Sequence, residues 1–160
     1  MGIYMKYGSI QGDATQQEFD GYINIISFDW KLHRHFALDQ VGRSFNREAS
    51  QARIDRCTVT KEVDHSSGEL LEAATTGFKG QPCEIVFLRT GNPGERYLTF
   101  KLTDTLISNL SVSGEGEERP SETIVLDFTE LEIVCKTLDE SNVSEDEMHI
   151  TYNAATGIGG

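Results

Sequence analysis

The chain has 160 residues, the length of one ordinary domain. Its 14 Lys and Arg residues against 26 Asp and Glu residues give a formal charge of −12. Free nucleic acid and anionic membrane surfaces are therefore poor partners, because both require basic patches. The apolar runs are far shorter than the roughly 20 residues that span a bilayer, and the first residues do not have the pattern of a secretory signal peptide.

Three cysteines at wide spacing, Cys57, Cys83 and Cys135, form neither a disulfide framework nor a zinc motif. They are typical of reduced thiols in a reducing compartment. His33 and His35 share one face of an expected strand, but no third ligand is evident, so we expect polar surface residues and no metal site. The sequence has no phosphate-binding loop and no nucleophile elbow. We expect no catalytic site and no cofactor.

Alternation of apolar and polar residues dominates the chain. Over Tyr22–Phe36 the even positions are mostly apolar and the odd positions from Ser27 are polar, which predicts a strand with one buried and one exposed face. Over Leu98–Val112 the same alternation predicts either one long bent strand or two strands that meet near Asp104.

A third stretch changes phase. Apolar residues occupy even positions over Ile124–Phe128 and odd positions over Leu131–Cys135, which predicts a β-bulge near residues 129–130. Bulges and long curved strands suit a closed or nearly closed barrel. Shorter strands are predicted at Ile3–Tyr7, Ile54–Val63, Glu84–Arg89 and Met148–Tyr152.

One helix is expected at residues 66–76, where Ser66 and Glu69 fit a capping box and Gly77 is placed to end the helix. Residues 37–51 have no firm period and are long for a structureless loop, so this loop is either functional or ordered by a partner. Residues 139–147 carry five acids and no base, and we expect this segment to be mobile.

Seven segments carry a resemblance to a known family. They are MKYGSIQGDAT (Met5–Thr15), INIISFDW (Ile23–Trp30), GRSFNREAS (Gly42–Ser50), VTKEVDHSSGELLEAATTG (Val59–Gly77), FLRTG (Phe87–Gly91), YLTFKLTDTLISNLSVS (Tyr97–Ser113) and ERPSETIVLDFTELEI (Glu118–Ile133). In this order they resemble the Hcp family, the haemolysin-coregulated tube proteins of bacterial type VI secretion. The tail from Leu138 does not match clearly, apart from a possible closing strand at Ile150–Asn153.

The resemblance implies a mainly β fold, a β-barrel of two antiparallel sheets with one short flanking α-helix. We expect a single domain over residues 1–160, with the barrel at 1–137, the extended loop at 37–51, the helix at 66–76 and an acidic tail at 138–160. The resemblance also implies homo-hexameric rings that stack into a tube inside a sheath, capped by a VgrG-type spike. Small effector proteins travel in the lumen of such tubes. It implies folding in the cytoplasm, export without a cleaved signal peptide, and no enzyme activity.

The polar face of the Tyr22–Phe36 strand is the predicted lumen wall, and the basic loop is the predicted contact between neighbours or stacked rings. The residues are Ser27, Asp29, Lys31 and His33 for the wall, and Arg43, Arg47 and Glu48 for the loop, with Glu117, Glu118 and Glu122 as acids on another subunit. Family members often have Gly where this chain has Lys31. The alternative is a monomeric or dimeric binding module of the same barrel fold, holding one protein or ligand, which predicts no ring at high concentration.

Overall fold

The computed structural model describes residues 1–34, 36–37, 48–49, 52–91, 94–138, 144–154 and 158–159. These residues form one helix and fourteen strands. The elements are β1 Gly2–Tyr7, β2 Ile23–Ile25, β3 Ser27–Asp29, β4 Leu32–His33, β5 Phe36–Ala37, β6 Glu48–Ala49, β7 Arg53–Ile54, β8 Cys57–Glu62, α1 Ser67–Thr76, β9 Gln81–Arg89, β10 Glu95–Ser113, β11 Ser121–Asp127, β12 Glu130–Leu138, β13 Ser144–Asn153 and β14 Ile158–Gly159.

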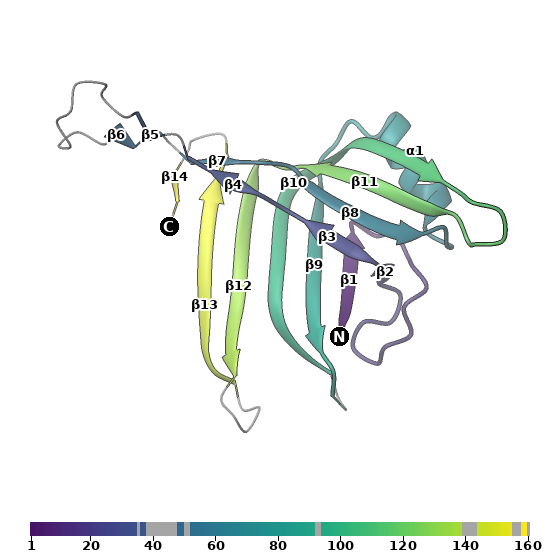
Figure 1. Cartoon of the computed structure of the whole chain (residues 1–160), viewed down its shortest axis with the longest axis horizontal. Helices are drawn as coiled ribbons and strands as arrows, with labels where there is room; N and C mark the ends of the chain where they lie inside the picture. The colour runs from purple at the N-terminus through teal and green to yellow at the C-terminus, as the bar shows by residue number, and fades with distance from the viewer. Residues whose placement is uncertain are drawn as a thin grey trace.

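Ten of the strands make one connected antiparallel arrangement that divides into two sheets (Figure 1). Sheet A has the order β14-β13-β12-β10-β9-β1-β2, and sheet B has the order β10-β11-β8-β3. The predicted two antiparallel sheets and single short helix are confirmed. The barrel, expected to be closed or nearly closed, is not fully closed among the described residues, because β2 ends sheet A, β3 ends sheet B and no ladder joins these two consecutive strands.

Strand β10 is the longest element and belongs to both sheets. Up to Thr105 it pairs with β9 and β12 in sheet A, and from Leu106 it pairs with β11 in sheet B. The bend lies at Asp104, whose φ is +49°, and a Cβ on Gly80 would meet the Asp104 Cα at 2.6 Å. One long bent strand is therefore confirmed. The bend shifts the buried phase by one residue, so Ile107 is buried whereas Leu106, expected inside, is 38% exposed.

The predicted single strand over Tyr22–Phe36 is wrong, because the chain changes sheets inside it. Ile23 and Ile25 are buried in β2 of sheet A, whereas Phe28 packs against the core from β3 of sheet B. Between them Ile26 is 58% exposed and its N–H donates to the Thr60 carbonyl at 2.7 Å. The change of sheet turns the buried positions from odd to even.

The predicted bulge near residues 129–130 is also wrong, for the same physical reason. β11 belongs to sheet B and β12 to sheet A, so the phase change marks a crossing between sheets and not an extra residue in one strand. The predicted strand 54–63 divides into β7 and β8, and the strands predicted at 3–7, 84–89 and 148–152 are confirmed as β1, β9 and β13. Residues 144–147, expected to be mobile, begin β13, and residues 139–143 lie outside the described residues.

The apolar core lies between the sheets, and α1 contributes Leu70, which is fully buried. Each fully buried Leu or Ile side chain contributes about 1.5–3 kcal/mol relative to an exposed one. The predicted capping box is wrong, since Ser66 makes no cap hydrogen bond and its hydroxyl donates to Asp64. Gly77 follows the helix as predicted, and its N–H donates to the Ala73 carbonyl. Among the described residues, no helix is both long enough and apolar enough to cross a membrane.

Candidate functional site

The outer face of sheet B is a wall of small polar side chains. Four residues with hydroxyl groups stand opposite one another across its four strands, one from each strand. The row is Ser27 in β3, Thr60 in β8, Thr123 in β11 and Ser111 in β10. All four side chains are exposed or half-buried. A surface of this kind offers hydrogen bonds without a strong charge or a large apolar patch.

A second row runs beside the first, from Asp29 through Thr58 and Val125 to Asn109. The residues between the rows point to the core, and Val59 and Ile124 are fully buried. Alternation along each strand therefore produces both the core and the polar wall. Ser27 and Asp29 were predicted for a polar wall, and the structure places both on the outer face of sheet B.

Lys31 and His33, the other two predicted wall residues, lie beyond sheet B. Lys31 connects β3 to β4, and its carbonyl accepts the Asp55 N–H at 2.9 Å. His33 in β4 has its Nδ1 3.7 Å from an Asp55 carboxylate oxygen. Asp29 and Lys31 also line an open cleft of about 510 Å³, where Arg56 lies 3.5 Å from Asp127. The cleft therefore extends the polar wall, and both acidic and basic side chains line it.

The predicted basic contact loop is only partly described. Arg43 and Arg47 lie outside the described residues, and Glu48 is in β6, which pairs with β5. Six of the 14 basic residues but only three of the 26 acidic ones fall between Lys31 and Arg56, so this segment has a formal charge of +3 and the rest of the chain −15. We call residues 31–56 the basic arm.

Glu117 and Glu118 lie in the exposed turn that joins β10 to β11. We call residues 114–118 the acidic turn. It lies at one end of the long axis of the molecule, whereas β5 and β6 of the basic arm lie at the other end (Figure 1).

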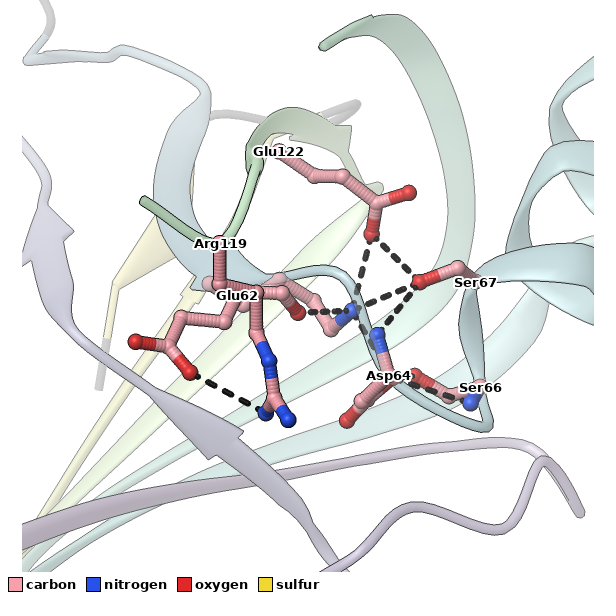
Figure 2. A network of polar contacts seen from close by, with 7 residues as sticks. Glu62, Asp64, Ser66, Ser67, Arg119 and Glu122 are labelled. Atoms are coloured by element: carbon pink, nitrogen blue, oxygen red, sulfur yellow. Dashed lines mark hydrogen bonds and ion pairs between the residues drawn. The ribbon is translucent and has the colours of Figure 1, made fainter. Parts of the chain in front are cut away.

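Glu122 was predicted to contact another subunit, and that prediction is wrong. The residue is 4% exposed, and its carboxylate accepts hydrogen bonds from the Lys61 ammonium at 2.8 Å and the Ser67 hydroxyl at 3.0 Å. Lys61 is fully buried and also lies 2.9 Å from an Asp64 carboxylate oxygen. Figure 2 shows Glu122, Ser67 and Asp64 converging where α1 meets β8 and β11. This network ties the helix to sheet B within one chain.

Sequence reasoning missed this network, although the signal was present. Lys61 continues the inward phase of Cys57 and Val59 along β8, and Glu122 opens the inward phase of β11. Two opposite charges at inward positions of paired strands predict a buried ion pair. The threonines of β8 and β11 on the polar wall were also missed, because their register depends on the pairing of strands that are distant in sequence.

Metal ligation and thiol chemistry can be checked for the described residues. No group of three or more His, Cys, Asp or Glu side chains among them is placed to hold a metal ion. Burial raises the pKa of the Cys57 thiol to about 12 and raises that of Cys83 as well, so neither is a ready nucleophile. His35, half of the histidine pair considered in the sequence, lies outside the described residues.

A comparison with known protein families identifies the family of this chain. The sequence profile described as "Type VI secretion system effector, Hcp" matches residues 4–134. The chain belongs to the Hcp family. The family is one of type VI secretion tube proteins, structural proteins rather than enzymes. No curated protein matches the chain significantly.

Solved structures of Hcp proteins have the same fold. A type six secretion system protein superimposes with a TM-score of 0.90 at 20% identity, covering 99% of each chain. Hcp1 from Salmonella typhimurium gives 0.75 at 20% identity and 99% of each chain, and the secreted Hcp3 from Pseudomonas aeruginosa gives 0.60 at 18% identity, 92% of this chain and 96% of that one. The structural likeness of this Hcp chain extends past residue 134, so the region of β13 belongs to the shared fold.

Proposed function

We propose that this chain is the subunit of a type VI secretion tube, in which six copies form a ring and the rings stack. The observation that carries the proposal is the match of the Hcp profile over residues 4–134. The tube stands inside a sheath below a VgrG-type spike and is exported from the cytoplasm without a cleaved signal peptide. Small effector proteins travel in its lumen.

The outer face of sheet B supports the assignment of a lumen wall. A passage that releases its cargo needs weak, reversible contacts, and hydroxyl rows provide them because each neutral hydrogen bond contributes only about 0.5–1.5 kcal/mol. Ser27 and Asp29 lie on this face, and Lys31 and His33 lie at its margin. These four residues remain our proposed effector contacts.

The opposite charges of the basic arm and the acidic turn support stacking. A contact between two different surfaces of identical subunits repeats from one ring to the next and builds a filament. The basic arm of one copy, with Arg43, Arg47 and Glu48, would meet Glu117 and Glu118 of a copy in the next ring. Each exposed pair contributes only about 0–1 kcal/mol, but the ring repeats each contact six times.

The first test is light scattering on a gel-filtration column, with negative-stain images of the eluted peak. A mass near six times 17.8 kDa with ring-shaped particles is the expected result. A monomer at every concentration would overturn the tube-unit proposal and favour a binding module of the same fold.

A further inference from the structure

A groove of about 300 Å³ lies on the face of sheet A that points away from the core. Its walls come from β10, β12 and β13, which lie side by side in that sheet (Figure 1). The lining residues are Arg96, Tyr97, Thr99, Lys101, Val134, Lys136, Glu147 and His149. Thr99 and Lys101 alternate along β10 with Phe100 and Leu102, which belong to the core. We call this hollow the sheet A groove, and the proposed lumen wall lies on the other sheet.

The sheet A groove is basic in a strongly acidic chain. Three of the 14 Lys and Arg residues line it against one acid, Glu147. The open cleft beside Asp29 is lined by two bases and three acids. A hollow of about 400 Å³ beside α1 is lined by two acids and no base. Because the chain as a whole carries a charge of −12, three cations around one groove indicate a site for an anion.

A β-bulge brings Arg96 into the groove. Alternation along a strand would put an even-numbered residue on the face opposite to Thr99 and Lys101. The pairing of β10 with β9 shifts by one residue between Arg96 and Leu98, so Tyr97 is the extra residue. The bulge therefore returns Arg96 to the face of the two groove residues. Bulges are frequent beside functional sites because they re-aim a side chain in this way.

Two lining groups have no partner among the described residues. The Lys101 ammonium makes no ion pair there, although Glu84 and Glu132 stand opposite it on the neighbouring strands. Thr99 is 3% exposed, and its hydroxyl makes no hydrogen bond with a described residue. Buried polar groups are nearly always hydrogen-bonded. An unpartnered buried hydroxyl beside three cations therefore indicates a ligand that accepts its hydrogen bond.

The other two cations have donors to spare. The Arg96 Nη1 is 3.4 Å from a Glu84 oxygen, and the guanidinium, which has five N–H donors, lies 5.1 Å from the centre of the Phe19 ring. The Lys136 ammonium, with three donors, is 3.0 Å from Glu147. A phosphate group carries a charge of about −1.5 to −2 near neutral pH and has three acceptor oxygens. It therefore competes for these donors better than a carboxylate does.

We propose that the sheet A groove binds a phosphate group, either as free phosphate or as a phosphate monoester. The cationic contacts are Lys101, Arg96 and Lys136, and the Thr99 hydroxyl donates a hydrogen bond to a phosphate oxygen. All lining residues belong to one chain, so the site requires no ring. Failure of this proposal would leave the proposed tube function intact.

Titration calorimetry at neutral pH and constant ionic strength tests the site. The probes are inorganic phosphate, glycerol 3-phosphate and acetate. We expect one saturable site per chain for at least one phosphate probe and weaker binding of acetate. The phosphate probe that binds more tightly identifies the source of the group. No saturable binding of either phosphate probe, or acetate binding as tight as that of phosphate, would overturn the proposal.

Matched variants locate the site. Lys101→Met should raise the dissociation constant for phosphate about tenfold or more, because it removes a charged donor, whereas Lys101→Arg should retain binding. Thr99→Val removes a neutral hydroxyl and should raise the constant about threefold. The controls Lys79→Met and Thr103→Val, at exposed positions outside the groove, should bind as the wild-type chain does. Unchanged binding in Lys101→Met would place the anion elsewhere on the chain and would overturn the proposal.

Discussion

The Lys61 ammonium and the Glu122 carboxylate are 2.8 Å apart and are both almost completely buried. They come from neighbouring strands, and the backbone register pairs Lys61 directly with Glu122. Ser67 at the start of α1 donates to the same carboxylate, and the Asp64 N–H donates to the Ser67 hydroxyl. The pair therefore fixes the helix to sheet B.

Lys61→Met is expected to lower the free energy of unfolding by about 3–5 kcal/mol, because it leaves Glu122 and Asp64 buried without their cation. Denaturation by urea measures the loss. Lys79→Met, at an exposed lysine, is the control and should change stability by less than about 0.5 kcal/mol. A loss of less than about 1 kcal/mol for Lys61→Met would show that the pair contributes little to stability.

The contrast between Lys61 and Ile26 shows how far the sequence predicts this fold. Alternation predicts strands, and alternation alone would place Lys61 inside, since it shares a phase with Val59. The change of sheet at Ile26 has no signal of its own in the sequence, because a phase change reads equally as a bulge, a bend or a crossing. Asp104 marks an interruption of the alternation, but the sequence does not decide between one bent strand and two strands. Which strands pair, and hence whether a barrel closes, depends on contacts between distant segments.

The candidate site was predictable to a similar degree. Ser27 and Asp29 could be placed on a polar strand face from their spacing. The opposing residues Thr60, Thr123 and Ser111 could not, since their register is set by strand pairing over long sequence distances. Glu122 was misplaced because an acid was assumed to be exposed, a fair assumption for most acids but not for one opposite an inward lysine.

A second prediction concerns pH and the pairing of β13 with β12. The His149 Nδ1 lies 2.9 Å from Glu132, and its Nε2 lies 3.4 Å from Glu147. Hydrogen bonds to Glu132 and then Glu147 raise the pKa of His149 above 6.5, and a hydrogen bond from Lys136 is the main cause that lowers the pKa of Glu147 below 4.5.

The signs of these shifts define a pH window. The contribution of His149 to the stability of the folded chain is complete below pH 6.5, and it is lost as pH rises through the pKa of His149 in the folded state. The contribution of Glu147 to the stability of the folded chain is complete above pH 4.5, and it is lost as pH falls through the lowered pKa of Glu147 in the folded state. Between pH 4.5 and 6.5 both contributions are present, so β13 should be held most firmly there.

Amide hydrogen exchange of β13 between pH 5 and 8, corrected for the intrinsic rate, measures this effect. Protection should decrease toward pH 8 in the wild-type chain and should depend less on pH in His149→Gln. Equal pH profiles for the two proteins would show that His149 does not hold the strand.

The thiols provide a third prediction. Cys57 and Cys83 are buried with raised pKa values, whereas Cys135 is partly exposed. At pH 8 a thiol-reactive disulfide reagent should modify one thiol per folded chain and all three after unfolding in guanidinium chloride. Cys135→Ser should remove the fast reaction. A fast reaction that survives in this variant would show that one of the buried thiols is accessible.

The proposed lumen wall is tested at Asp29. Asp29→Tyr puts a bulky side chain on the outer face of sheet B, away from the core, so the ring should persist while a co-produced effector becomes less stable. The effector level in the producing cell measures the change. Asp13→Tyr, at an exposed acid outside sheet B, is the control. An effector level that stays unchanged in Asp29→Tyr would show that Asp29 does not contact the cargo.

The proposed contact between the basic arm and the acidic turn is tested by charge reversal. Arg43→Glu combined with Arg47→Glu removes two positive charges from the arm and adds two negative ones, so sedimentation velocity should show smaller assemblies. Glu117→Arg combined with Glu118→Arg should have a similar effect alone and should partly restore assembly when all four changes are combined. Because exposed ion pairs weaken as salt screens them, the wild-type assembly should also dissociate at high ionic strength. Unchanged sedimentation of the arginine variant would rule out this contact, since every ring would contain twelve reversed charges without any loss of assembly.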